Sequence, residues 1–235
     1  MKALFVSVTL AAIALSAPAS AQAVWDQIPP NDAGTTIVSQ DFESSFDAYD
    51  SSIIDDFTLG GSTQLTSLDA LLQGFNGGES HVGDISNFTV NIYSSVAKAA
   101  SGLAGDVFSG AVPSNGVTIT DPFGTNTRMV HVPFSATLPA GQYYVGLLNR
   151  LDFSSGGEVG VLTWGNGNAT LANPGGGFGL GTSMSTMSIG GGGNASYRLN
   201  GAAVPEPATW AMMVAGVGVL GGMLRSNRRK ALAAA

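Results

Sequence analysis

The chain has 235 residues, contains no cysteine and carries a formal net charge of −7 at pH 7. The lack of cysteine excludes disulfides, thiolate zinc sites, iron–sulfur clusters and thiol nucleophiles. Between residues 24 and 203, four bases stand against fifteen acids, a net charge of −11 that repels phosphate backbones and excludes nucleic acid as a partner.

The first 23 residues have the pattern of a secretory signal peptide. Lys2 supplies a positive charge, residues 3–15 are mostly apolar, and small residues then form two cleavage patterns that end at Ala21 and Ala23. Signal peptidase is expected to cut after one of these alanines. The body, residues 24–203, is then expected to be one domain, large enough for its own hydrophobic core.

Short alternating runs bounded by Gly, Asn, Asp, Ser and Pro fill the body, and helical periodicity is almost absent. The clearest strand is 87–93, in which Phe88, Val90 and Ile92 share one face. Other strands are expected at residues 35–42, 51–59, 65–72, 106–112, 116–120, 129–134, 142–148, 159–164 and 196–201. This spacing predicts an all-β fold, an antiparallel β-sandwich or jelly-roll-like single domain. Residues 94–103 fit a short helical turn or a loop equally well.

Asp55 and Asp56 form the most suggestive acidic pair of the body. Neighbouring residues of a strand face opposite sides, so the two carboxylates are not expected to act together as a glycosidase pair. The favoured interpretation is structural, with one carboxylate turned inward to accept backbone hydrogen bonds. A calcium site that combines either residue with Asp41, Asp47 or Asp50 is the alternative, although no local calcium-binding loop is present. No cofactor and no established metal site is predicted.

His81 and His131 are the only histidines, and hence the only candidates for a histidine-based hydrolase. His131 alternates with valines in an expected strand, and His81 falls in an expected loop. No Gly-x-Ser-x-Gly elbow is present, and we expect no catalytic residue and no enzymatic activity. A Ser-His-Asp triad stays open as an alternative.

Two further features of the body each have a structural and a functional interpretation. Trp25, Trp164, Tyr143 and Tyr144 are expected to pack in the core or at strand edges, with stacking on sugar rings as the alternative. The glycine-rich segments 174–181 and 190–193 predict a mobile loop and lack the Gly-Lys-Ser/Thr sequence of a phosphate-binding loop.

Residues 204–235 have three parts. Pro205-Glu206-Pro207 is expected to be extended, because each proline disfavours helix in the residue before it. The apolar run 210–224 would make roughly 22 Å of helix, at the lower limit for a hydrocarbon core of about 30 Å. A basic cluster follows and favours a cytoplasmic C-terminus; it consists of Arg225, Arg228, Arg229 and Lys230.

The segment Val204–Met213, VPEPATWAMM, resembles the PEP-CTERM sorting signal in its PEPxxWA variant. The resemblance rests on Pro205, Glu206, Pro207, Trp210 and Ala211. It implies an exosortase substrate, processed by that membrane cysteine protease-transpeptidase of Gram-negative bacteria, and an association with exopolysaccharide or biofilm systems. A simple single-pass C-terminal anchor is the alternative.

Segments 24–27, 39–42, 55–59 and 88–93 also resemble a β-rich module common in exported PEP-CTERM proteins. That resemblance implies a β-sandwich with no assigned activity. The sequence thus predicts an exported structural or adhesive protein of the cell surface or extracellular matrix. A carbohydrate- or calcium-binding module and a secreted hydrolase are the alternatives.

Overall fold

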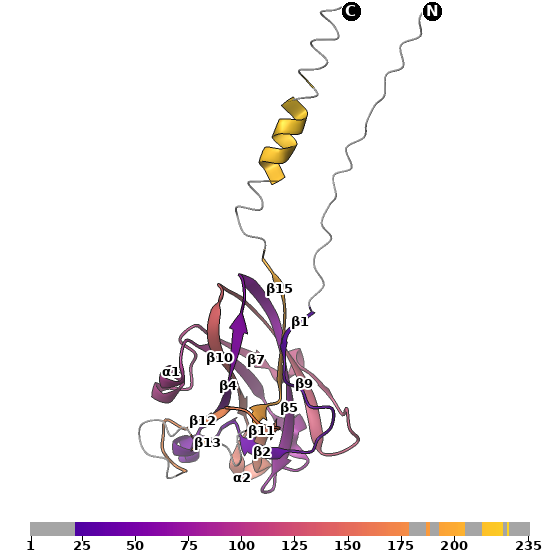
Figure 1. Ribbon diagram of the computed structural model, residues 1–235. Helices are drawn as coiled ribbons and strands as arrows, with labels where there is room; N and C mark the ends of the chain where they lie inside the picture. The colour runs from indigo at the N-terminus through magenta and orange to yellow at the C-terminus, as the bar shows by residue number, and fades with distance from the viewer. Residues whose placement is uncertain (1–21, 179–186, 189–192, 205–212, 223–224, 226–235) are drawn as a thin grey trace, which may run out of the picture.

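A computed structural model describes residues 22–178, 187–188, 193–204, 213–222 and 225. Within them, an eight-stranded sheet and a seven-stranded sheet pack face to face (Figure 1). We call them the β5 sheet and the β4 sheet after a long strand in each. The predicted antiparallel β-sandwich is confirmed.

The β5 sheet contains β1 (Gln22–Asp26), β2 (Thr35–Val38), β5 (Thr63–Phe75), β8 (Thr118–Thr120), β9 (Thr127–Leu138), β11 (Glu158–Trp164), β14 (Asn194–Ala195) and β15 (Tyr197–Ala203). The β4 sheet contains β3 (Gln40–Asp41), β4 (Ser52–Leu59), β6 (Asn87–Tyr93), β7 (Phe108–Pro113), β10 (Gly141–Arg150), β12 (Thr170–Ala172) and β13 (Met187–Ser188). Among the pairings of the described strands, β3 with β10 is the parallel one. The helical turns are η1 (Ser44–Tyr49), η2 (His81–Asp84), α1 (Val96–Ser101), η3 (Ser114–Gly116) and α2 (Phe153–Gly156).

Strand β5 organises its sheet because it pairs with three neighbours. It pairs with β9 along one side, and with β15 and then β11 along the other. Opposite β15, a register shift between Asn200 and Gly201 gives β5 one extra residue, Thr66. It brings Leu65 onto the core face together with Leu68 and Leu72, as the apolar pattern of this segment predicts.

The core lies between the two sheets, where alternate residues of each strand are buried. From the β4 sheet, Ile53, Phe57 and Leu147 meet Leu68 and Val132 of the β5 sheet in one cluster. A smaller cluster covers the outer face of the β4 sheet, where α1 lies against it. Segment 94–103 therefore contains a helical turn. Ala99 of this turn is buried in one cluster with Ile54, Tyr93 and Ala172.

Several strand boundaries differ from the sequence-based prediction. Residues 136–138, expected in a loop, continue β9, and only Pro139 and Ala140 separate β9 from β10. Residues 136–138 pair with residues 63–65 of β5, and this pairing outweighs the loop-forming residues. Strands β1, β12, β13 and β14 were not predicted, since they have two to five residues and show little alternation.

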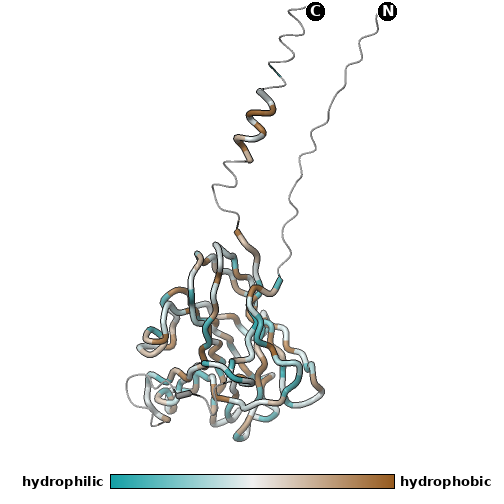
Figure 2. Tube along the Cα trace, in the orientation of Figure 1, coloured by the Kyte–Doolittle hydropathy of each residue, from teal (hydrophilic) through white to brown (hydrophobic). Residues whose placement is uncertain are grey.

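Residues 213–222 are helical, and their side chains are exposed. Figure 2 shows the hydrophobic positions along this segment, among which Val214 and Leu220 are 70% and 63% exposed. Among the described residues, no helix has the length and apolar character needed to cross a membrane.

Candidate functional site

Asp55 points into the core and connects the two sheets. Its side chain is buried and accepts hydrogen bonds from Ala195 N–H of the β5 sheet, at 2.7 Å, and from Asp56 N–H, at 2.9 Å. Burial raises the pKa of Asp55 to about 7, although these two hydrogen bonds act in the opposite direction. The geometry gives Asp55 the inward structural role that strand alternation predicts.

Asp56 faces the other way and accepts hydrogen bonds from Gln142 and Asn168. The other proposed calcium ligands are occupied elsewhere: Asp50 accepts a hydrogen bond from Phe42 N–H, and Asp41 lies 3.6 Å from Arg150. The structure thus does not bring the candidate ligands together around Asp55 or Asp56. Among the described residues, no group of three or more His, Asp or Glu side chains could hold a metal ion.

Each histidine is paired with one aspartate. His81 Nδ1 lies 2.6 Å from Asp84 Oδ2 in η2, and His131 Nδ1 lies 2.6 Å from Asp69 Oδ1 across β5 and β9. The His81 pair borders a cavity of about 310 Å³ that is also lined by Ser86 and Ser155. In the described part of the chain, no hydrogen bond joins either histidine to a serine hydroxyl, so the arrangement has an oriented base but no activated nucleophile.

The aromatic residues that could have stacked on sugars take part in packing. The rings of Trp25 and Tyr143 both lie near the ring of Phe57, with centroid-to-centroid distances of 6.0 and 5.7 Å. Trp164 donates its indole N–H to the carbonyl of Gln27 at 2.6 Å. Tyr144 packs against the cluster on the outer face of the β4 sheet. These positions agree with the core and edge interpretation.

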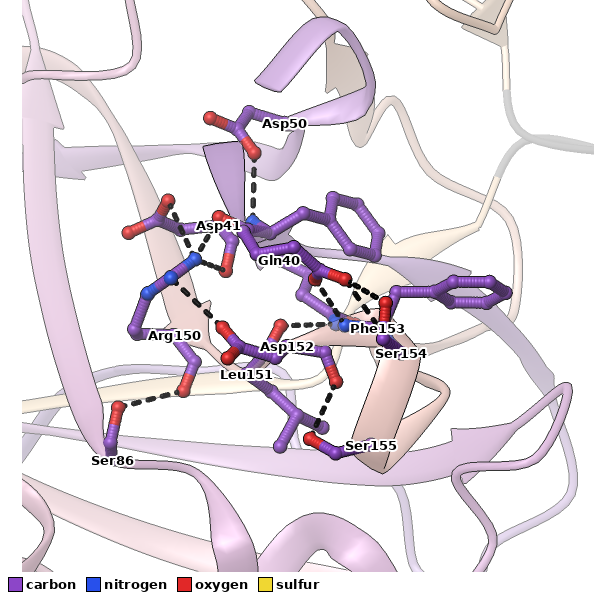
Figure 3. Close-up of polar contacts among 12 residues, drawn as sticks. Gln40, Asp41, Asp50, Ser86, Arg150, Leu151, Asp152, Phe153, Ser154 and Ser155 are labelled. Carbon is purple, nitrogen blue, oxygen red and sulfur yellow. Dashed lines mark hydrogen bonds and ion pairs between the residues drawn. The ribbon is translucent and has the colours of Figure 1, made fainter. Parts of the chain in front are cut away.

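The most concentrated set of charged groups lies where β3, η1, β10 and α2 meet. We call it the acidic corner; it consists of Asp41, Asp47, Asp50 and Asp152 with Arg150, of Glu43, which binds the first turn of α2, and of Glu158, which lines a cavity with Phe42 and Phe153. Arg150 extends from the end of β10, lies 2.9 Å from Asp152 and donates hydrogen bonds to the carbonyls of Asp41 and Phe42 (Figure 3). The guanidinium therefore holds β3 and the loop after β10 together.

Glu43 and Gln40 fix the position of α2. The Glu43 carboxylate accepts hydrogen bonds from Phe153 N–H at 2.6 Å and Ser154 N–H at 3.1 Å, at the first turn of the helix. The Ser154 hydroxyl, also bound to it, is the main cause that lowers the pKa of Glu43 to about 2. Gln40 is fully buried and its side chain bonds three backbone groups, those of Leu151, Gly157 and Val159.

Burial and like charge perturb other carboxyl groups of the acidic corner. Burial is the largest cause that raises the pKa of Asp50 to about 6, and the neighbouring charges of Asp41 and Asp47 add to it. Burial also raises the pKa of Glu158. Arg150 alone does not neutralise six carboxylates, so this surface attracts positive charge.

Five aromatic rings lie beside these charges. We call the set the aromatic groove; its rings belong to Phe42, Phe46, Tyr49, Phe153 and Phe178. They line a cavity of about 190 Å³ together with Glu158. The sequence analysis missed this set, because its members come from three separate segments. The available signal was the sequence Phe42 to Tyr49, which contains three aromatic and two acidic residues.

The glycine-rich segment contributes Phe178 to this groove. Gly177 N–H donates to Ala48 O at 2.8 Å, and Asn173 donates to the carbonyls of Ala48 and Asp50. A Cβ at Gly175 or Gly177 would lie 2.6 Å from Ala48 O, so these glycines permit close backbone contact. Residues 174–178 of the predicted mobile loop thus make specific contacts with η1, and residues 179–181 and 190–192 lie outside the described residues.

Comparison with known proteins identifies the C-terminal segment. Residues 203–230 match the family model described as the PEP-CTERM protein-sorting motif. The chain carries a PEP-CTERM sorting motif. The motif indicates an exported protein that is sorted through an exosortase. No curated protein and no solved structure gave a significant match to the chain.

The PEP-CTERM motif follows the sandwich directly, since the match begins at Ala203, the last residue of β15. Arg225 is helical and exposed, and β1 begins at Gln22, one residue before Ala23. The remaining predicted sorting and cleavage residues lie outside the described residues; they are Ala21, Pro205, Glu206, Pro207, Trp210, Ala211, Arg228, Arg229 and Lys230.

Proposed function

We propose that the protein is a non-enzymatic β-sandwich of structural or adhesive type, at the cell surface or in the extracellular matrix of a Gram-negative bacterium. Signal peptidase removes the N-terminal segment, and the apolar run 210–224 with its basic end holds the chain in the inner membrane until exosortase acts. Association with exopolysaccharide is part of the proposal and rests on the family resemblance of the tail.

One observation carries the proposal: the sorting motif matches residues 203–230 and begins where the last strand ends. Cleavage within the motif would remove no strand and no residue of the main core cluster. The acidic body supports the same conclusion, because a net charge of −11 favours solubility after release from the membrane.

The triple variant Pro205→Ala/Glu206→Ala/Pro207→Ala tests sorting in the native host. We expect it to accumulate as an unprocessed precursor in the inner membrane, because the recognition sequence is gone while the apolar run is intact. Glu79→Ala, an exposed acid of the body, is the control and should be processed normally. Processing and release of the triple variant at the wild-type level would refute the sorting role.

A hydrolase is the second candidate, favoured by one observation: the His81–Asp84 pair borders a cavity with two serines. If the cavity is catalytic, turnover of ester or glycoside substrates should fall by at least about 100-fold in His81→Ala. His131→Ala, which removes the other paired histidine, is the matched control. No turnover by the wild type, or equal turnover in both variants, would exclude this candidate.

A further inference from the structure

The aromatic groove continues into a second cavity. Glu158 and Phe178 line both the cavity of about 190 Å³ and an adjoining cavity of about 340 Å³, whose other walls are mainly apolar. Its lining comes from Thr36, Ile37, Val38, Phe75 and Leu171. Among the described residues that line the two cavities, Glu158 has the only charged side chain. A single carboxylate thus faces a continuous apolar surface.

The rings of the groove point their faces in different directions. Phe46 and Phe153 are 5.3 Å apart at 63°, and Tyr49 and Phe178 are 5.2 Å apart at 79°. Ring faces carry the negative part of the aromatic quadrupole, so a cavity lined by five aromatic rings favours a cation over an anion. Such an arrangement attracts a cation that is large and weakly hydrated.

The charged groups around the groove are also mainly negative. The acidic corner holds six carboxyl groups and one base, Arg150, which is already engaged with Asp152 and with two backbone carbonyls. An anionic ligand would be repelled. Calcium is a poor fit for the groove itself, because it requires six to eight oxygen ligands and the lining supplies mostly carbon.

The groove lies at the end of the sandwich farthest from the sorting motif. Ala203 pairs with Thr63 and Glu158 pairs with Phe75, at opposite ends of β5. The twelve residue-to-residue steps from Thr63 to Phe75 span about 40 Å at 3.3 Å per step. Figure 1 shows α2 at the lower end of the sandwich and β15 running to the upper end. A ligand could therefore reach the groove while the tail is held at a membrane.

We propose that the aromatic groove binds an organic ammonium ion, with Glu158 opposite the positive charge and the rings of Phe46, Tyr49, Phe153 and Phe178 around its alkyl groups. The ligand class is a small alkylammonium or quaternary ammonium compound. Both the charge and the apolar substituents contribute to recognition, so an inorganic cation or a neutral alcohol binds less well. The inference does not depend on the sorting or adhesive role.

Calorimetric titration of the full chain in a non-ionic detergent, with a micelle blank subtracted, tests the proposal. The probes are choline and 3,3-dimethylbutan-1-ol, which has the same shape but no charge. We expect choline to bind at least about tenfold more tightly than the alcohol, since the charge accounts for about 1–2 kcal/mol of a cation–π site. Glu158→Gln should reduce the affinity for choline about tenfold, whereas Glu79→Gln, with the same charge change on an exposed site outside the groove, should not.

Tyr49→Leu provides a second variant, because Tyr49 is 39% exposed and its replacement leaves the core intact. It should weaken choline binding by about threefold to tenfold with unchanged thermal unfolding. Equal affinity for choline and its neutral analogue would overturn the proposal. Undetectable choline binding by the wild type would do the same, as would wild-type affinity in folded Glu158→Gln.

Discussion

At the residue scale, buried polar side chains connect the two sheets where a hydrophobic core alone would not fix their register. Asp55 binds Ala195 N–H of the opposite sheet, and Tyr197 donates its hydroxyl to Ile53 O at 2.8 Å and accepts Leu147 N–H at 3.2 Å. Each bond crosses between the sheets and gives a buried backbone group a side-chain partner. These side chains select one arrangement of the sheets.

The raised pKa of Asp55 predicts how stability depends on pH. Its folded pKa is about 7 and the ordinary pKa of an aspartate is 3.8, so between these values the folded state holds a proton that the unfolded state releases. The free energy of unfolding should therefore fall as pH rises from about 4 to 7, by at most about 4 kcal/mol from this group, and level off above pH 7. The pKa of Asp50 is also raised, to about 6, so this group too lowers the free energy of unfolding as the pH rises.

Glu43 has the opposite effect on the pH dependence of stability, because its folded pKa of about 2 lies below the ordinary value of 4.5 for a glutamate. Its contribution is present above about pH 4.5 and is lost as pH falls toward 2. We therefore expect a stability maximum near pH 4 to 5 in urea unfolding measured from pH 3 to 8. Asp55→Asn should flatten the decline between pH 4 and 7; an unchanged slope in that variant would show that Asp55 does not titrate there.

The sequence predicted some of these residue roles and missed others. Strand alternation alone placed Asp55 and Asp56 on opposite faces, and the structure has them so. It could not show which acids meet at Arg150, because Asp41 and Asp152 are more than a hundred residues apart and only the parallel pairing of β3 with β10 brings them together. The aromatic groove depends on the same non-local pairing.

At the scale of elements, predictability followed the length and regularity of each strand. Strand β6 begins and ends as predicted, at Asn87 and Tyr93, because its alternation is uninterrupted. The two-residue strand β14 forms only because Ala195 and Asn194 meet Thr163 and Trp164 of β11. The local sequence carries no pattern that predicts such a short pairing, because the tertiary structure decides it.

The glycine-rich segment shows how the same composition can specify close packing. Gly177→Ala places a Cβ 2.6 Å from Ala48 O and 2.9 Å from the Tyr49 ring, so the segment must move away from η1. We expect a loss of about 1–3 kcal/mol in the free energy of unfolding, together with weaker choline binding as Phe178 shifts. Gly61→Ala, where a Cβ meets nothing within 4 Å, is the matched control in the same urea titration. Equal effects of the two substitutions would contradict the packing role.

At the scale of the whole molecule, both ends of the sandwich chain leave from neighbouring strands. Gln22 of β1 pairs with Gly201 of β15, two residues before the sorting motif begins at Ala203. Figure 1 shows β1 beside β15, whose C-terminal end lies at the upper end of the sandwich. The end of the sandwich that carries the sorting motif is thus separated from the acidic corner, which lies at the other end of β5.

Intact-mass spectrometry of the native exported protein tests the central claim most directly. A processed PEP-CTERM protein should begin at Gln22 or Val24 and end near Pro205–Pro207, with or without an added group at the new C-terminus. The mass should therefore lack the apolar run 210–224 and the four basic residues after it. A mass that retains residues 213–235 on the exported protein would contradict processing through the motif and would support a permanent C-terminal anchor.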